Sequence, residues 1–118
     1  MPRIFGIDIS ATGDTLFGPI TLLDNQASPQ TIHTFNASSD RYIQLQYSIS
    51  RNGFFRTGRL LITNNGSAAS LSDDNVEAIS ALGIVLSATV SGPDLLLQYT
   101  SANTGFNASF EYFQKKWS

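Results

Sequence analysis

The chain has 118 residues, a formal net charge of −2 and a sequence pI near 5.0. Hydrophobic residues make up 42% and charged residues only 14%, against roughly 25% charged residues in an average soluble domain. This length and composition predict a single domain, residues 1–118, with an apolar core and a polar, mostly uncharged surface. The absence of cysteine excludes disulfides and thiolate chemistry. The charge gives no sign of nucleic-acid binding, and no apolar run approaches the roughly 18 residues that a membrane span needs.

The first forty residues alternate less regularly than the rest of the chain. Residues 3–10 show an alternating pattern, and residues 15–23 carry several apolar side chains in a run that Gly18-Pro19 interrupts. Because a central strand rarely tolerates proline, residues 1–23 are interpreted as edge strands or as an arm that anchors the chain to a partner. A short strand is predicted after Pro29, over residues 30–35.

The clearest strand is predicted over residues 42–51, where apolar and polar side chains alternate strictly. Its apolar face consists of Ile43, Leu45, Tyr47 and Ile49. The following Asn52-Gly53 predicts a tight hairpin turn. A second strand is predicted over residues 56–64, and Asn64-Asn65-Gly66 predicts another hairpin turn.

Residues 67–82 give a weaker pattern. Residues 67–72 predict a short strand, and Ser72-Asp73-Asp74-Asn75 predicts a polar loop. Val76, Ile79 and Leu82 fit one or two helical turns, or equally a loop with buried anchors. The two alternatives stay open.

Three strands are predicted in the last third of the chain, separated by Gly/Pro and Asn/Gly turns. The expected inward-facing residues are Ile84, Leu86, Ala88, Val90, Leu95, Leu97, Tyr99, Phe106, Ala108, Phe110 and Tyr112. Eight or nine strands with turns about every ten residues predict an all-β antiparallel β-sandwich of jelly-roll-like topology.

No motif for catalysis, a cofactor or a metal is found. The only histidine, His33, lies in a short strand-like run without a nucleophile motif, so a structural role is expected. Asp73-Asp74-Asn75 lacks the spaced oxygen ligands of a calcium loop. The sequence therefore predicts a protein that is not an enzyme and needs no cofactor.

The candidate interface residues are aromatic and arginine side chains. Phe54 and Phe55 lie beside a predicted turn, and neighbouring strand residues face opposite ways, so at least one could be exposed for binding. The alternative, left open, is that both rings fold back over the open end of the sandwich. Trp117 is expected to anchor the C-terminus to the core, with insertion into a neighbouring subunit as the alternative. The complete candidate set is Arg51, Phe54, Phe55, Arg56, Arg59 and Trp117.

Charge is distributed unevenly in the middle of the chain. Arginines cluster between residues 41 and 59, and the acidic Asp73, Asp74 and Glu77 follow. A solvated surface is the favoured interpretation of both groups. The alternative is that the two patches meet between copies of the chain.

From Arg41 to Trp117 the order of motifs resembles a module common in tailed-bacteriophage virion proteins. The resemblance is carried by Tyr47-Ser48-Ile49-Ser50-Arg51, Arg56-Thr57-Gly58, Asn65-Gly66, Tyr99-Thr100, Asn103-Thr104-Gly105 and Lys116-Trp117. It implies a non-enzymatic building block of a virion, made in the host cytoplasm.

Within that class, a small domain that starts at its own Met1 without a fibre shaft resembles capsid decoration (cement) proteins. This implies a cyclic homotrimer on the capsid surface that bridges subunits of the major capsid protein through multivalent contacts. The alternative is a receptor- or glycan-binding module of a phage tail or head fibre. That alternative predicts exposed aromatic and amide side chains on one surface.

Overall fold

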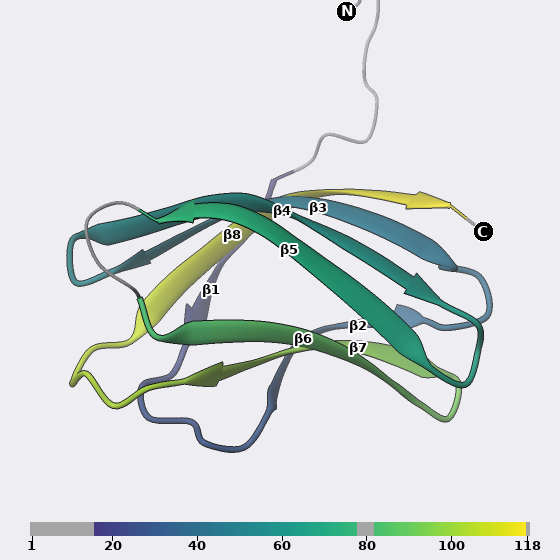
Figure 1. Ribbon diagram of the computed structural model, residues 1–118, viewed down its shortest axis with the longest axis horizontal. Helices are drawn as coiled ribbons and strands as arrows, with labels where there is room; N and C mark the ends of the chain where they lie inside the picture. The colour runs from purple at the N-terminus through teal and green to yellow at the C-terminus, as the bar shows by residue number, and fades with distance from the viewer. Residues whose placement is uncertain (1–15, 78–81, 118) are drawn as a thin grey trace, which may run out of the picture.

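Eight β-strands make up the regular secondary structure in a computed structural model of the chain, which describes residues 16–77 and 82–117 (Figure 1). The strands are β1 (Phe17–Leu22), β2 (Gln30–Asn36), β3 (Tyr42–Arg51), β4 (Phe54–Asn64), β5 (Ala69–Glu77), β6 (Ile84–Ser91), β7 (Asp94–Ser101) and β8 (Ala108–Trp117). The strand predicted at residues 3–10, most of the predicted arm and the possible helical anchor Ile79 lie outside the described residues.

The strands form two antiparallel sheets that pack as two layers (Figure 1). The larger sheet has five strands in the order β1-β8-β3-β4-β5, and the smaller has three in the order β2-β7-β6. The predicted all-β sandwich is confirmed. The jelly-roll pairings of β1 with β8 and of β2 with β7 are present, whereas β3, β4 and β5 form a meander within the larger sheet.

The hairpin between β3 and β4 sets the register of the larger sheet. Asn52 (φ 50°) and Gly53 (φ 80°) both adopt the left-handed conformation, as a two-residue hairpin turn of type I′ requires. The strands then pair without a break from Arg51 opposite Phe54 to Tyr42 opposite Thr63. The predicted turn is confirmed, and it fixes which side chains of both strands face the core.

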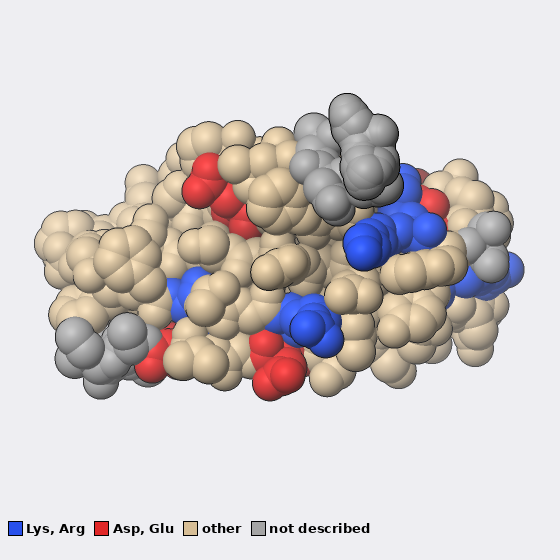
Figure 2. Space-filling view, turned by 90° about the horizontal axis from the view of Figure 1, so that it is seen from above, with Lys and Arg blue, Asp and Glu red and all other residues tan. Residues whose placement is uncertain are grey.

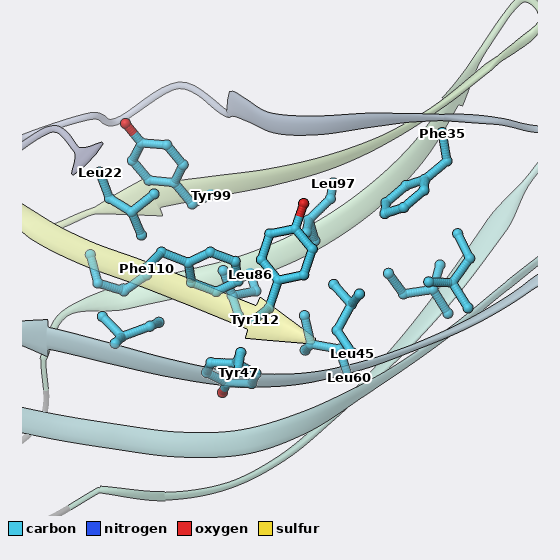
Figure 3. Packing of buried hydrophobic residues seen from close by; sticks show 14 of the residues in the cluster. Leu22, Phe35, Leu45, Tyr47, Leu60, Leu86, Leu97, Tyr99, Phe110 and Tyr112 are labelled. Atoms are coloured by element: carbon cyan, nitrogen blue, oxygen red, sulfur yellow. The ribbon is translucent and has the colours of Figure 1, made fainter. Parts of the chain in front are cut away.

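The core lies between the two sheets and is formed by alternate residues of the central strands (Figure 3). The predicted apolar face of β3 is buried, as are Leu95, Leu97 and Tyr99 of β7. On β8, Ala108, Phe110 and Tyr112 face inward, and the Tyr47 and Phe110 rings stack with centroids 5.6 Å apart. Burial of each large side chain contributes roughly 1.5–3 kcal/mol.

The polar loop predicted at Ser72–Asn75 is wrong, because β5 runs through it to Glu77. All of β5 pairs with β4, so its backbone gains ladder hydrogen bonds despite the low strand propensity of Asp and Asn. The Tyr47 hydroxyl also donates a hydrogen bond to the Asp73 carboxylate at 2.7 Å. These contacts between strands outweigh the preference of Asp and Asn residues for loops.

The prediction that Phe106 faces the core is also wrong. Strand β8 begins only at Ala108, and the Phe106 side chain is 48% exposed in the preceding loop. Phe106 contributes to the fold through its backbone carbonyl, which accepts a hydrogen bond from Arg51.

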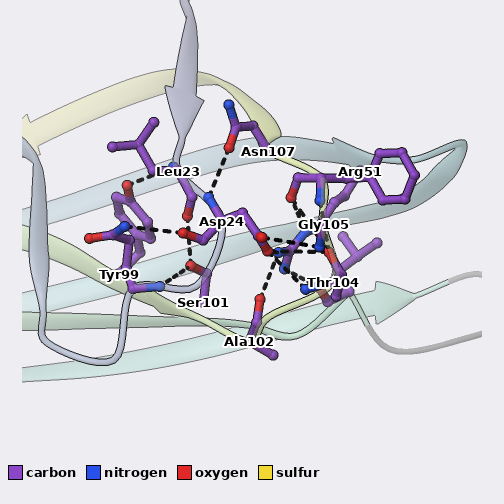
Figure 4. A network of polar contacts seen from close by, with 12 residues as sticks. Leu23, Asp24, Arg51, Tyr99, Ser101, Ala102, Thr104, Gly105 and Asn107 are labelled. Atoms are coloured by element: carbon purple, nitrogen blue, oxygen red, sulfur yellow. Dashed lines mark hydrogen bonds and ion pairs between the residues drawn. The ribbon is translucent and has the colours of Figure 1, made fainter.

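Arg51, the last residue of β3, connects the loops at one end of the sandwich (Figure 4). Its side chain is only 3% exposed. It donates hydrogen bonds to the carbonyls of Leu82 (2.8 Å), Ala102 (2.7 Å) and Phe106 (2.9 Å), and its Nη2 pairs with the Asp24 carboxylate. We call this group of contacts the Arg51 clamp. It joins the larger sheet to loops that enter and leave the smaller one.

Asp24 completes the clamp from the loop after β1. Its carboxylate accepts hydrogen bonds from the backbone N–H groups of Thr104 (2.8 Å) and Gly105 (3.0 Å). The Thr104 N–H, with the Gly105 N–H and the Arg51 guanidinium, holds the pKa of Asp24 below its usual value, although partial desolvation opposes this shift. The folded structure therefore favours the ionised carboxylate.

Replacing Arg51 with Met is expected to destabilise the protein by about 3 kcal/mol or more, because a buried charge partner is removed and three carbonyls lose their donor. The measurement is urea unfolding followed by circular dichroism. Arg59→Met, at an exposed arginine of β4, is the matched control and should change stability by less than about 0.5 kcal/mol. Equal effects of the two substitutions would contradict the role of the clamp.

The Asp24 carboxylate should make stability depend on acid pH. Because its pKa is lower folded than unfolded, its contribution is complete above about pH 4 and is lost as pH falls through the folded value. Thermal unfolding at pH 7 and pH 3 should therefore show a smaller loss of stability for Asp24→Asn than for the unmodified protein. An identical loss in both proteins would refute this assignment.

Candidate binding face

Two of the candidate interface arginines have their side chains inside the domain. Arg51 forms the clamp, and Arg56, only 7% exposed, donates from Nη2 to the Ile84 carbonyl at 2.7 Å and to the Glu77 carboxylate at 3.1 Å. The acidic partner of Arg56 is thus on the neighbouring strand of the same chain. Buried as they are, Arg51 and Arg56 present little surface to another molecule, and their contact with a partner stays a prediction.

Of the two alternatives for the phenylalanines beside the β3–β4 turn, the structure shows that at least one ring is exposed. Phe54 packs against the core, whereas Phe55 is 57% exposed on the opposite side of β4. Arg59 is exposed on that same side, with Asp74 of β5 beside it in register. Phe55 and Arg59 therefore remain available for binding.

The favoured prediction for Trp117, anchoring to the core, is wrong. Because Phe110 and Tyr112 face inward, alternation turns Phe113, Lys115 and Trp117 outward. Trp117 is 47% exposed and its ring lies against that of Tyr42 on β3, with centroids 5.0 Å apart. It is also at the opposite end of β3 from the turn that carries Phe55, so the candidate residues do not form one patch.

The surface that Trp117 joins is the side of the larger sheet turned away from the core, which we call the outer face. Strand register places its side chains in rows across β8, β3 and β4. The rows are Trp117, Tyr42 and Thr63; then Lys115, Gln44 and Leu61; then Phe113, Gln46 and Arg59. Exposed aromatic and amide side chains therefore gather on one surface, as the fibre alternative predicted.

Two depressions shape the outer face. One, of about 330 Å³, is lined by Gln44, Gln46, Phe113, Gln114 and Lys115 between β3 and β8. The other, of about 410 Å³, is lined by Tyr42, Leu61, Ile62, Thr63, Ser70, Leu71 and Ser72. Figure 2 views the molecule from this side and shows charged groups of both signs, some of them adjoining, scattered among uncharged side chains. The arrangement suits a ligand bound mainly by ring contacts and hydrogen bonds.

His33 has a packing role at the inner side of β2. Its Nδ1 lies 2.9 Å from the Tyr112 hydroxyl, and its ring centroid is 4.4 Å from that of Phe35. Burial, followed by the nearby Lys116 charge, lowers the pKa of His33. This environment favours a neutral imidazole held among aromatic rings, in agreement with the structural role expected for it.

Neither a metal-binding cluster nor a membrane-spanning helix is found among the described residues. Residues 16–77 and 82–117 contain no group of three or more His, Cys, Asp or Glu side chains arranged to hold a metal ion. No helix in the described part of the chain is long and apolar enough to cross a membrane.

Sequence reasoning missed Tyr42, Gln44, Gln46, Phe113 and Lys115 as a group. The alternation of β3 indicated that Gln44 and Gln46 share a face, which is correct. The pairing of β3 with β8, more than sixty residues away, is what brings Phe113 and Lys115 beside them. The register between β3 and β8 is set by the whole sheet, so no local sequence pattern reveals it.

No protein-family model matches the chain, and no curated protein matches it. The fold is similar to part of a solved structure, the crystal structure of the Acinetobacter phage vB_ApiP_P1 tailspike protein, with a TM-score of 0.57 and 14% sequence identity over 92% of this chain. The chain spans 23% of the length of that tailspike protein. This similarity establishes a shared fold.

Outer-face aromatic side chains should contribute little to stability. Tyr42→Ala and Trp117→Ala are each expected to change the free energy of unfolding by less than about 1 kcal/mol, because both rings are half exposed. Tyr112→Ala, which removes a buried ring, should cost about 3–5 kcal/mol. Chemical denaturation of the three variants makes the comparison, and a loss at Trp117 as large as at Tyr112 would show that Trp117 belongs to the core.

Proposed function

We propose that this chain is a non-enzymatic structural module of a bacteriophage virion that recognises a receptor as part of a tail or head fibre or spike. The observation that carries the proposal is the fold, which nearly the whole chain shares with part of a phage tailspike protein. The exposed aromatic and amide side chains of the outer face supply a surface for recognition.

The acidic side chains support a non-enzymatic role. Asp24 and Glu77 are ion-paired with buried arginines, and Asp73 accepts a hydrogen bond from Tyr47. The Leu82 N–H, with the neighbouring Arg56, lowers the pKa of Glu77. A general acid needs a raised pKa, so the bonding of Asp24 and Glu77 suits structural ion pairs rather than acid catalysis.

The second candidate is the capsid decoration protein that the sequence resemblance implies. The domain measures 44 × 34 × 20 Å, and such a slab has a broad face for the roughly 800 Å² per partner that a stable interface buries. Binding to the major capsid protein, and the homotrimer that goes with it, stay predictions.

The test is immunogold electron microscopy of virions that carry this protein, with antibodies raised against the purified chain. Gold at the tail or at fibre tips is the expected result. Gold distributed over the capsid surface would instead support decoration, and virions that contain the protein in neither place would refute both candidates.

A further inference from the structure

We propose that the depression between β3 and β8 on the outer face binds an acidic oligosaccharide, with Phe113 and the Tyr42–Trp117 pair as stacking surfaces and Lys115 as the partner of a sugar carboxylate. The proposal rests on the proposed recognition function and names its ligand and site. It depends on three features of the depression: the spacing of the rings, the amides between them and the local charge.

Phe113 lines the depression, and Trp117 lies two residues beyond Lys115 on β8. Phe113 and Trp117 both point outward and are four residues apart, which corresponds to about 13 Å along a strand. Trp117 contacts Tyr42, so one end of the site carries two adjoining rings. The C–H groups of a pyranose are weakly positive and are attracted to the negative face of an aromatic ring. A ligand that reaches both ends must therefore contain several sugar rings.

The amides lie between the rings. Gln44 is in register with Lys115, and Gln46 with Phe113. Each glutamine amide both donates and accepts hydrogen bonds, which matches sugar hydroxyl groups. Both side chains line the depression and are already partly solvated, so a ligand replaces water at low desolvation cost.

The charge of the site selects the class of sugar. Lys115 is the single ionisable side chain among the residues that line this depression. Two acidic groups of the outer face line adjoining depressions: that of Asp74 shares Gln46 with this one, and that of Glu111 shares Gln46 and Phe113. Negative charge therefore lies toward the Phe113 end of the site and positive charge at Lys115. Arg59 lies beside Gln46 in register, with Asp74 on its other side. A ligand that carries a carboxylate at the Lys115 end complements this pattern, whereas a neutral glycan leaves the ammonium group unpaired.

Trp117, the only tryptophan of the chain, reports binding from within the site. The experiment begins with an array of acidic and neutral bacterial polysaccharides, with oligogalacturonate as a defined acidic probe. Acidic glycans that bind are then titrated while tryptophan emission is recorded. Acidic glycans should bind and change the emission in a saturable way, and maltoheptaose, a neutral probe, should not.

Matched variants locate the site. Lys115→Ala and Phe113→Ala should each weaken binding at least tenfold, which is about 1.4 kcal/mol. Lys116→Ala is the control for charge, because Lys116 points to the other side of β8 toward Asp40. Phe106→Ala removes an exposed ring outside the outer face and is the control for Phe113. Both controls should bind like the unmodified protein.

The proposal is overturned if no acidic polysaccharide binds, if neutral glycans bind equally well, or if Lys115→Ala and Phe113→Ala bind normally. Binding of a dT oligonucleotide with the same dependence on Lys115 would also overturn it, in favour of a general polyanion site. Gold labelling of tail structures together with an absence of glycan binding refutes this inference alone. Gold over the capsid surface, or in neither place, refutes the proposed function itself.

Discussion

The sandwich depends at one end on the burial of a single guanidinium group. Arg51 reaches from the end of β3 to carbonyls beside β6, β7 and β8 and to the carboxylate of Asp24. A guanidinium has five N–H donors in a rigid planar fork, so it can fix several loops at once. In a chain without cysteine, this polar network holds the two sheets together where other small domains use a disulfide.

For function, the consequence is that some polar side chains hold the fold together, whereas others stay open to solvent. Arg51 holds the loops together at one end of the sandwich, and Arg56 pairs with Glu77 inside the larger sheet. The outer face of the larger sheet keeps the exposed rings of Tyr42, Phe113 and Trp117, with the amides of Gln44 and Gln46 between them. A rigid, regular sheet holds these rings and amides at fixed spacing, and such preorganisation lowers the entropic cost of binding.

Local sequence patterns predicted the strands and turns well where one face is buried. Strict alternation located β3, β7 and the inner half of β8, and Asn52-Gly53 located the first hairpin turn. The patterns failed where contacts across the sheet decide the outcome. Asp73 is in a strand because β4 and Tyr47 hold it there, and Trp117 faces outward because β8 continues beyond the core. The arginines looked like surface residues because no local signal shows that distant carbonyls will surround them.

The proposed recognition function requires the outer face to be turned toward the receptor. Hydroxyl-radical footprinting of intact virions, with and without polysaccharide from the host surface, tests it directly through the reactive rings of Tyr42, Phe113 and Trp117. These side chains are expected to be modified in free virions and protected once the polysaccharide is added, while Phe106, which lies outside the outer face, reacts equally in both states. Protection of the three outer-face rings in free virions, with no further change on adding polysaccharide, would show that the face is buried against the virion and would contradict the proposed function.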